Sequence, residues 1–114
     1  MDVDGLTAFV AERFSAVADP DKAGPMAAYM KTDMPFYGVQ AAPRVQILRD
    51  VVGRFPPVDR SDYRLAVLTL WNQPHREEKY VAIEYARAFP PFVTEHRDQL
   101  SGLSYREATK HLDL

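Results

Sequence analysis

Apolar residues recur every three or four positions along most of this chain, which is the spacing of one face of an α-helix. Leu6, Val10 and Phe14 share such a face, so the pattern predicts a helix over about residues 4–17 with Asp4 as its N-cap. Further helices are predicted at about residues 25–31, 43–54, 60–72 and 75–89, followed by a short piece at 92–99 and a last helix at about 104–112. No segment shows the alternating pattern of a β-strand.

Prolines and glycines separate the predicted helices. The run Asp19-Pro20-Asp21 is expected to end the first helix, and Gly24 with Pro25 to begin the second, because proline fits the first helical turn. Residues 35–42 are predicted to form a loop around Gly38. Short turns between about six helices predict an all-α fold in which successive helices run antiparallel.

Helix starts near residues 4, 43 and 76 suggest helix pairs that repeat every 35 to 40 residues or so. This period is typical of HEAT-like repeats, which stack into an α-solenoid. The repeats show no clear residue-by-residue similarity. A plain helical bundle is therefore the alternative architecture.

The helical faces also predict the core. Its expected members are Leu6, Phe9, Val10, Phe14, Val17, Met26, Ala27, Met30, Val45, Leu48, Val51, Val52, Phe55, Tyr63, Ala66, Val67, Leu70, Trp71, Val81, Ala82, Tyr85 and Phe89. Leu65 and Leu68 add apolar surface on the other side of the fourth helix, which suggests that this helix is sandwiched. Trp71 could instead serve as a stacking platform for a base or a sugar, but its spacing continues the apolar face and favours the core.

Composition limits the class of protein. The chain has 114 residues and a mass of 13.0 kDa, with 46% hydrophobic and 26% charged residues, as in a single globular domain. No apolar run is long enough for a transmembrane helix, and the acidic N-terminus does not resemble a secretory signal. The absence of cysteine excludes disulfides and thiolate chemistry. A cytoplasmic location is the expectation.

Charge is unevenly distributed along the chain. The net charge is −2, with 14 basic and 16 acidic side chains, whereas nucleic-acid-binding domains are usually basic. The middle of the chain is the locally basic stretch, because residues 41–64 contain five arginines and three aspartates: Arg44, Arg49, Arg54, Arg60 and Arg64 with Asp50, Asp59 and Asp62. A solvated helix face and a contact surface for phosphates are both compatible with this stretch.

Metal and cofactor motifs are missing from the sequence. The spacing of His75, His96 and His111 matches no zinc motif, and no glycine-rich nucleotide loop is present. Glu77 and Glu78 form a charged helix entrance, and as neighbours they point in different directions, which makes them poor paired acid and base catalysts. We expect no cofactor and no metal.

Polar and aromatic residues flank the predicted loop at residues 35–42. Tyr29 precedes this loop, Gln40 lies within it and Arg44 follows it at the start of the third predicted helix. Arginine, tyrosine and glutamine side chains, together with backbone N–H groups at a helix start, are the donors that bind phosphate. The loop is therefore a candidate contact site for a nucleic-acid backbone.

The same region resembles the AlkD-like DNA alkylation repair family. The likeness is carried by PMAAYMK at residues 25–31, FYGVQ at 36–40, PR at 43–44, LW at 70–71 and PHRE at 74–77. It implies a HEAT-like solenoid and, as the family's activity, a monofunctional DNA glycosylase that removes N3- or N7-alkylated purines. It further implies that Tyr29, Gln40 and Arg44 face the backbone of double-stranded DNA, and that the segment with Trp71 packs two helices together.

The sequence also departs from that family. The likeness covers residues 1–97, and residues 101–114 resemble the family's last helix, so the chain is expected to be one truncated domain without the catalytic middle. Family members use an aspartate on a tryptophan-rich segment, whereas no tryptophan follows Trp71 here. Glu95 and Asp98 are the carboxylates nearest the junction, and no catalytic residue is assigned. The chain is therefore expected not to excise bases.

Two non-catalytic functions remain as alternatives. The arginine-rich middle favours a module that binds the DNA backbone weakly. The segment from Tyr80 to Phe89 is apolar on more than one face, which favours a self-associating module and predicts a homodimer that buries this surface. No membrane partner is expected.

Overall fold

The computed structural model describes residues 1–89. Over this range the chain forms five helices and no strand, which confirms the predicted all-α class. The helices are α1 (Val3–Ala16), α2 (Pro20–Tyr29), α3 (Ala41–Arg54), α4 (Arg60–Trp71) and α5 (Arg76–Ala88). Within the described range, no helix is long and apolar enough to cross a lipid bilayer. The helices predicted at residues 92–99 and 104–112 lie outside this range.

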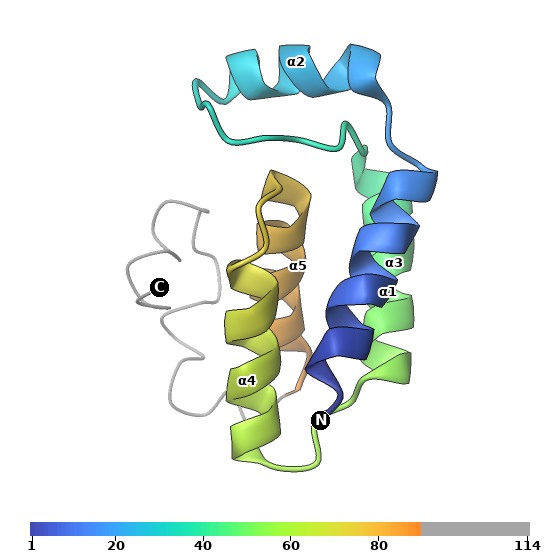
Figure 1. The fold of residues 1–114 in the computed structure, drawn as a ribbon, viewed down its shortest axis with the longest axis vertical. Helices are drawn as coiled ribbons and strands as arrows, with labels where there is room; N and C mark the ends of the chain where they lie inside the picture. The colour runs from blue at the N-terminus through green and yellow to red at the C-terminus, as the bar shows by residue number, and fades with distance from the viewer. Residues whose placement is uncertain (90–114) are drawn as a thin grey trace.

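Four of the helices form two antiparallel pairs (Figure 1). One pair is α1 with α3 and the other is α4 with α5, and the pairs lie side by side so that α1 packs on α4 and α3 packs on α5. Helix α2 lies across one end of this arrangement. Because α3 and α5 are parallel, both begin at the end that α2 covers.

The core lies between the two pairs. Leu6, Val10 and Phe14 of α1 are fully buried, and all five core positions predicted for α4, including Trp71, are buried as expected. Two buried tyrosines tie the helices together at the end away from α2. The hydroxyl of Tyr63 donates to the carbonyl of Ala86 (2.6 Å), which links α4 to α5.

The second of these hydrogen bonds runs from the hydroxyl of Tyr85 to the carbonyl of Phe55 (2.8 Å), the residue that ends α3. Burial raises the pKa of Tyr63 and of Tyr85, because each phenol is removed from water. Both tyrosines therefore stay neutral donors at ordinary pH.

The predicted core was wrong at several positions. In α3 the buried residues are Ile47 and Val51, whereas Val45 is 42% exposed. Helix α3 touches α1 on one side and α5 on the other, so its buried stripe is centred between the two neighbours. No residue of α2 is buried, so the prediction that Met26, Ala27 and Met30 join the core is wrong. The reason is that α2 covers only the end of the helix pairs.

The outer faces of α1 and α4 differ from the prediction as well. Val17 and Leu65 are exposed, so residues 1–89 do not cover α4 on the side of Leu65. The apolar face expected on α5 is already buried within the single chain at five positions: Val81, Ala82, Ile83, Tyr85 and Ala86. This burial removes the observation from which the homodimer was predicted, and the homodimer itself stays a prediction.

Helices α1 and α2 begin earlier than the sequence pattern predicted, because aspartates cap both of them. The carboxylate of Asp2, not Asp4, caps α1 by accepting from the N–H of Gly5 (2.8 Å). Asp19 does the same for α2 through the N–H of Asp21 (3.0 Å), so α2 begins at Pro20 and Pro25 lies inside it. The aspartate cap and a proline at the first position start the helix earlier than Pro25 would.

The loop between α2 and α3 passes through Gly38, as predicted. Gly38 has a φ of +87°, a conformation that glycine adopts far more readily than other residues. A Cβ atom at this position would collide with the backbone carbonyl of Asp19. The backbone N–H of Asp19 in turn donates to the carbonyl of Tyr37 (3.0 Å), so the loop lies directly against the start of α2.

We expect Gly38→Ala to lower the free energy of unfolding by about 2 kcal/mol or more, because it adds both strain at positive φ and a backbone collision. Urea unfolding followed by circular dichroism would measure this. Gly24→Ala is the matched control, since no atom lies within 4 Å of a Cβ there. In the middle of α2 it should raise stability by about 0.5–1 kcal/mol. Equal effects of the two changes would contradict the role of Gly38.

Candidate nucleic-acid interface

A buried carboxylate shapes the end of the molecule that carries the candidate site. Glu77, in the first turn of α5, is fully buried. Its two carboxylate oxygens accept hydrogen bonds from three consecutive backbone N–H groups, those of Tyr37 (3.0 Å), Gly38 (2.9 Å) and Val39 (3.0 Å). The next residue is the N-cap of α3, so Glu77 fixes where α3 begins.

Glu78 performs a second structural task at the same helix start. Its Oε1 accepts from the backbone N–H of His75 and also lies 3.1 Å from Nδ1 of the His75 ring. This ring stacks on Tyr37 with 3.7 Å between ring centres, and Tyr37 stacks on Phe14 of α1 at 5.3 Å. Burial raises the pKa of Tyr37 to about 12, and the neighbouring Glu78 adds to the shift.

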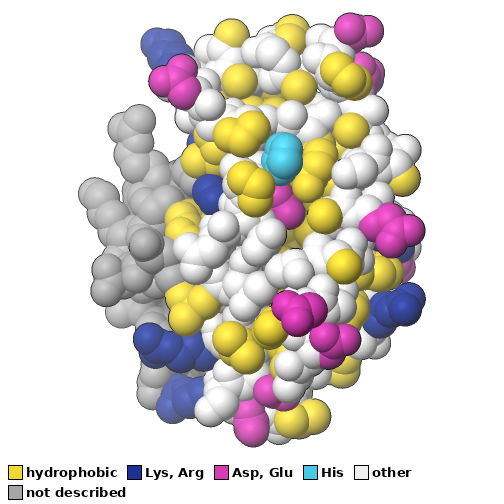
Figure 2. All heavy atoms as spheres, viewed as in Figure 1, with side chains coloured by type: hydrophobic (Ala, Val, Ile, Leu, Met, Phe, Trp, Pro, Cys, Tyr) yellow, Lys and Arg dark blue, Asp and Glu magenta, His cyan; other side chains and the backbone are white. Residues whose placement is uncertain are grey.

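Figure 2 shows a histidine side chain at the surface beneath α2, with hydrophobic side chains beside it. His75 is the histidine among residues 1–89, and its side chain is partly exposed. The stack of Phe14, Tyr37 and His75 therefore runs from the core to the surface.

The pair Glu77-Glu78 is thus a structural element that the sequence pattern did not reveal. The charged helix entrance was expected, but its burial and its partners were not. Acidic residues are common in a first helical turn because their negative charge interacts favourably with the partial positive charge of the helix N-terminus. Nothing in a single sequence indicates that one of them binds a loop 38 to 40 residues earlier.

Lys79 joins α4 to α5. Its Nζ donates to the backbone carbonyls of Trp71 (2.8 Å) and Gln73 (2.6 Å), which lie at the end of α4. Burial lowers the pKa of Lys79. Trp71 is only 8% exposed, which confirms its predicted core position. The LW and PHRE segments therefore meet where two helices pack, as the resemblance implied.

The three residues predicted to bind phosphate lie around the start of α3. Gln40 is the exposed N-cap of α3, and its carbonyl accepts from the N–H of Arg44 (3.2 Å) in the first turn. Tyr29 ends α2 and is 85% exposed. Tyr29 and Arg44 line one hollow of about 400 Å³, whose other lining residues are Pro25, Met26, Met30, Phe36 and Tyr80.

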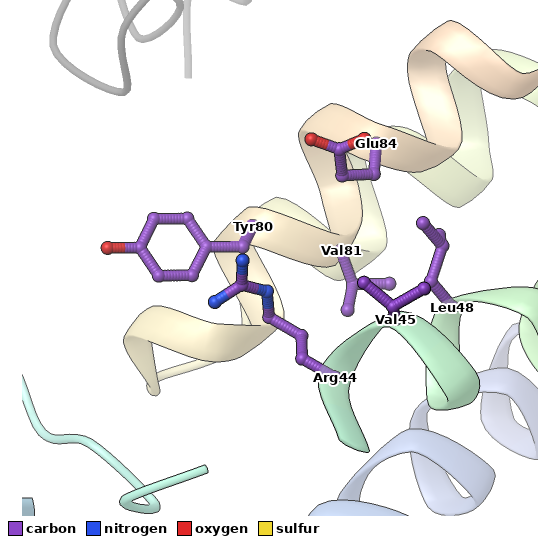
Figure 3. A pocket seen from close by; sticks show the side chains of 6 residues that line it. All are labelled: Arg44, Val45, Leu48, Tyr80, Val81 and Glu84. Carbon is purple, nitrogen blue, oxygen red and sulfur yellow. The ribbon is translucent and has the colours of Figure 1, made fainter. Parts of the chain in front are cut away.

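Tyr80 of α5 also lines this site, with the buried Arg76 beside its ring, although sequence reasoning placed neither residue there. The Cζ atom of Arg44 lies 4.7 Å from the centre of the Tyr80 ring, and that of Arg76 lies 5.7 Å from it. Figure 3 shows the guanidinium of Arg44 beside this ring, with Glu84 one turn further along α5. Residues one turn into α5 can reach Arg44 because α3 and α5 pack in parallel.

A second, smaller hollow of about 130 Å³ runs between α3 and α5 (Figure 3). Val45, Leu48 and Val81 line it with Arg44, Tyr80 and Glu84. Arg44 and Tyr80 line both hollows, so the two side chains form the wall between them.

The remaining arginines of the basic stretch do not gather at this site. Arg49 and Arg54 line a groove between α1 and α3 with Phe9 and Arg13. There Arg13 forms an ion pair with Asp50 (2.6 Å), which lowers the pKa of that carboxyl. On the face drawn in Figure 2, basic side chains are distributed over several places rather than in one patch. The basic stretch therefore splits between different surfaces.

Metal-ligating side chains do not cluster in the part of the chain that the structure describes. Residues 1–89 contain no group of three histidine, aspartate or glutamate side chains arranged to hold a metal ion. Glu77 and Glu78 instead bind backbone N–H groups.

Comparison with protein families places most of the chain in a known family. Residues 10–91 match the profile of a family described as DNA alkylation repair enzyme. The matched range includes α2 to α5 whole and all the residues placed above around the start of α3. No curated protein matches the chain.

We expect Glu77→Gln to lower the free energy of unfolding by about 2–3 kcal/mol, because an amide has one acceptor oxygen where the carboxylate has two, and its NH2 group would face a backbone N–H donor. Glu84→Gln is the control on the same helix, since Glu84 is exposed and pairs with Arg87 at 3.5 Å. Its effect should stay within about 0.5 kcal/mol. Urea unfolding would measure the free energy of unfolding of both variants. A Glu77 variant as stable as the Glu84 variant would show that the carboxylate does not hold the loop.

Proposed function

Because the chain belongs to the DNA alkylation repair enzyme family, we propose that the start of α3 contacts the phosphates of duplex DNA. The contact would involve Tyr29, Gln40 and Arg44, without reading the base sequence. We further propose that the residues described here position DNA and do not cleave the glycosidic bond.

One observation carries the proposal, namely the electrostatic character of the start of α3. Its first turn contains no acidic residue and contains Arg44. A helix N-terminus carries partial positive charge and N–H groups that point outward, both of which favour an anion. Arg44 adds a full charge and the forked donors that match phosphate oxygens. Tyr29 and Gln40 are both exposed, and Tyr29 lines the same hollow as Arg44.

The arrangement of the helices supports the HEAT-like part of the proposal. The pair α1 with α3 and the pair α4 with α5 point the same way, and equivalent helices of the two pairs pack on each other. Stacking of equivalent helix pairs is how solenoids form. We therefore propose that the two pairs are consecutive repeats, with α2 inserted in the first.

The lack of catalysis is proposed from the surroundings of Trp71, the only tryptophan of the sequence. Its side chain is buried, and Lys79 lies over it with Nζ 5.6 Å from the ring centre. The nearby Glu77 and Glu78 are buried as well. Cleavage of a glycosidic bond requires a carboxylate placed against the sugar. The alternative, that the chain has the glycosylase activity of its family, is left to experiment.

Arg44→Ala should weaken duplex binding by about tenfold, equally for unrelated DNA sequences. It should also reduce the slope of log K against log salt concentration by about one. Fluorescence anisotropy with a labelled duplex at several salt concentrations measures both. Arg49→Ala is the charge-matched control, because Arg49 is exposed on the α1–α3 groove. If the two variants bind alike, net charge rather than this site determines binding. If the unchanged protein does not bind even at low salt, the proposed function fails.

The chain should release no N3-methyladenine or N7-methylguanine from methylated duplex DNA above the spontaneous rate. Base release would be measured with protein in excess over DNA, so that even a slow single turnover is detected. The physical reason is the proposed lack of a carboxylate positioned against the sugar, because loss of positioning costs orders of magnitude in rate. Any acceleration that depends on the protein would refute the non-catalytic part of the proposal and leave the DNA contact in place.

A further inference from the structure

We infer that Tyr80 is a positioning residue for phosphate binding, and that it acts by holding the guanidinium of Arg44 against its ring. Arg76 adds a second positive charge at the same ring. This inference rests on the proposed function and adds two residues of α5 to the site on α3.

The geometry of Arg44 and Tyr80 is that of a cation–π contact. The Cζ atom of Arg44 is 4.7 Å from the ring centre, within the range over which an aromatic face attracts a cation. Such contact occupies the flat face of the guanidinium and leaves its N–H donors, which lie in the plane of the group, available to an anion. Figure 3 shows the guanidinium beside the ring, with the hydroxyl of Tyr80 directed away from the helices.

Positioning matters here because Arg44 is long and only half-buried. A free arginine side chain loses rotamer entropy when it is fixed. A ring that already restricts the side chain before DNA arrives lowers the entropy lost on binding, which increases affinity without a new contact to DNA.

The start of α5, which carries Tyr80, is joined to the loop before α3. Arg76, one turn earlier in α5, is 6% exposed, and its backbone N–H donates to the carbonyl of Pro35 (2.9 Å). Its Cζ atom is 5.7 Å from the same ring.

A double-mutant cycle separates positioning from direct contact. Duplex binding would be measured by anisotropy for the unchanged protein, Arg44→Ala, Tyr80→Leu and the double variant, with urea unfolding to confirm that each is folded. Tyr80→Leu alone should weaken binding by about two- to fivefold. In the Arg44→Ala background the same change should have no further effect, since Tyr80 acts through Arg44.

Two conservative variants complete the test. Tyr80→Phe keeps the ring and should bind like the unchanged protein. Arg44→Lys keeps the charge but loses the flat group that stacks on the ring, and it should bind more weakly than the unchanged protein. This second variant leaves α5 intact, so it tests the stack even if Tyr80→Leu unfolds.

Each other outcome overturns the inference in a recognisable way. Additive effects of Arg44→Ala and Tyr80→Leu would show that Tyr80 does not act through Arg44. Loss of binding in Tyr80→Phe would show that its hydroxyl contacts DNA directly. Both results leave the proposed function standing, provided that Arg44→Ala still weakens binding. If the unchanged protein does not bind the duplex at all, the proposed function and the inference fail together.

Discussion

The carboxylate of Glu77 connects parts of the chain that are far apart in sequence. It projects from the start of α5 and accepts three hydrogen bonds from the loop before α3. A buried carboxylate is strongly unfavourable unless its lost hydration is replaced. Here three backbone N–H groups replace it, and these same N–H groups would otherwise be unpaired at a sharp turn through Gly38. The carboxylate and the loop therefore satisfy each other.

The position of the candidate interface follows from this interaction. Glu77 fixes the residues that directly precede α3, and these residues determine where Gln40 and Arg44 lie relative to α5. The two parallel helices thus begin side by side at one end of the molecule, beneath α2. Arg44 contacts Tyr80 there because α3 and α5 begin at the same end of the molecule.

The first turns of α3 and α5 differ in the charge of their side chains. The start of α5 contains Glu77 and Glu78, which balance its partial positive charge within the protein. The start of α3 has no such acid and contains Arg44 instead. The acids at the start of α5 are therefore buried and paired inside the protein, whereas Arg44 is partly exposed at the start of α3. This contrast is the basis on which we propose phosphate binding for a chain of net charge −2.

The sequence by itself determined the five helices of residues 1–89, apart from the start of α2, and most of the core, because apolar spacing is a local property that reflects one buried face per helix. It also placed Tyr29, Gln40 and Arg44 around one loop, since they are close along the chain. Tertiary structure alone decided that Glu77 is buried, that Val45 is exposed and that Tyr80 reaches Arg44. Each of these depends on which helices become neighbours. That choice depends on contacts between residues some 30 to 40 positions apart, which no local pattern encodes.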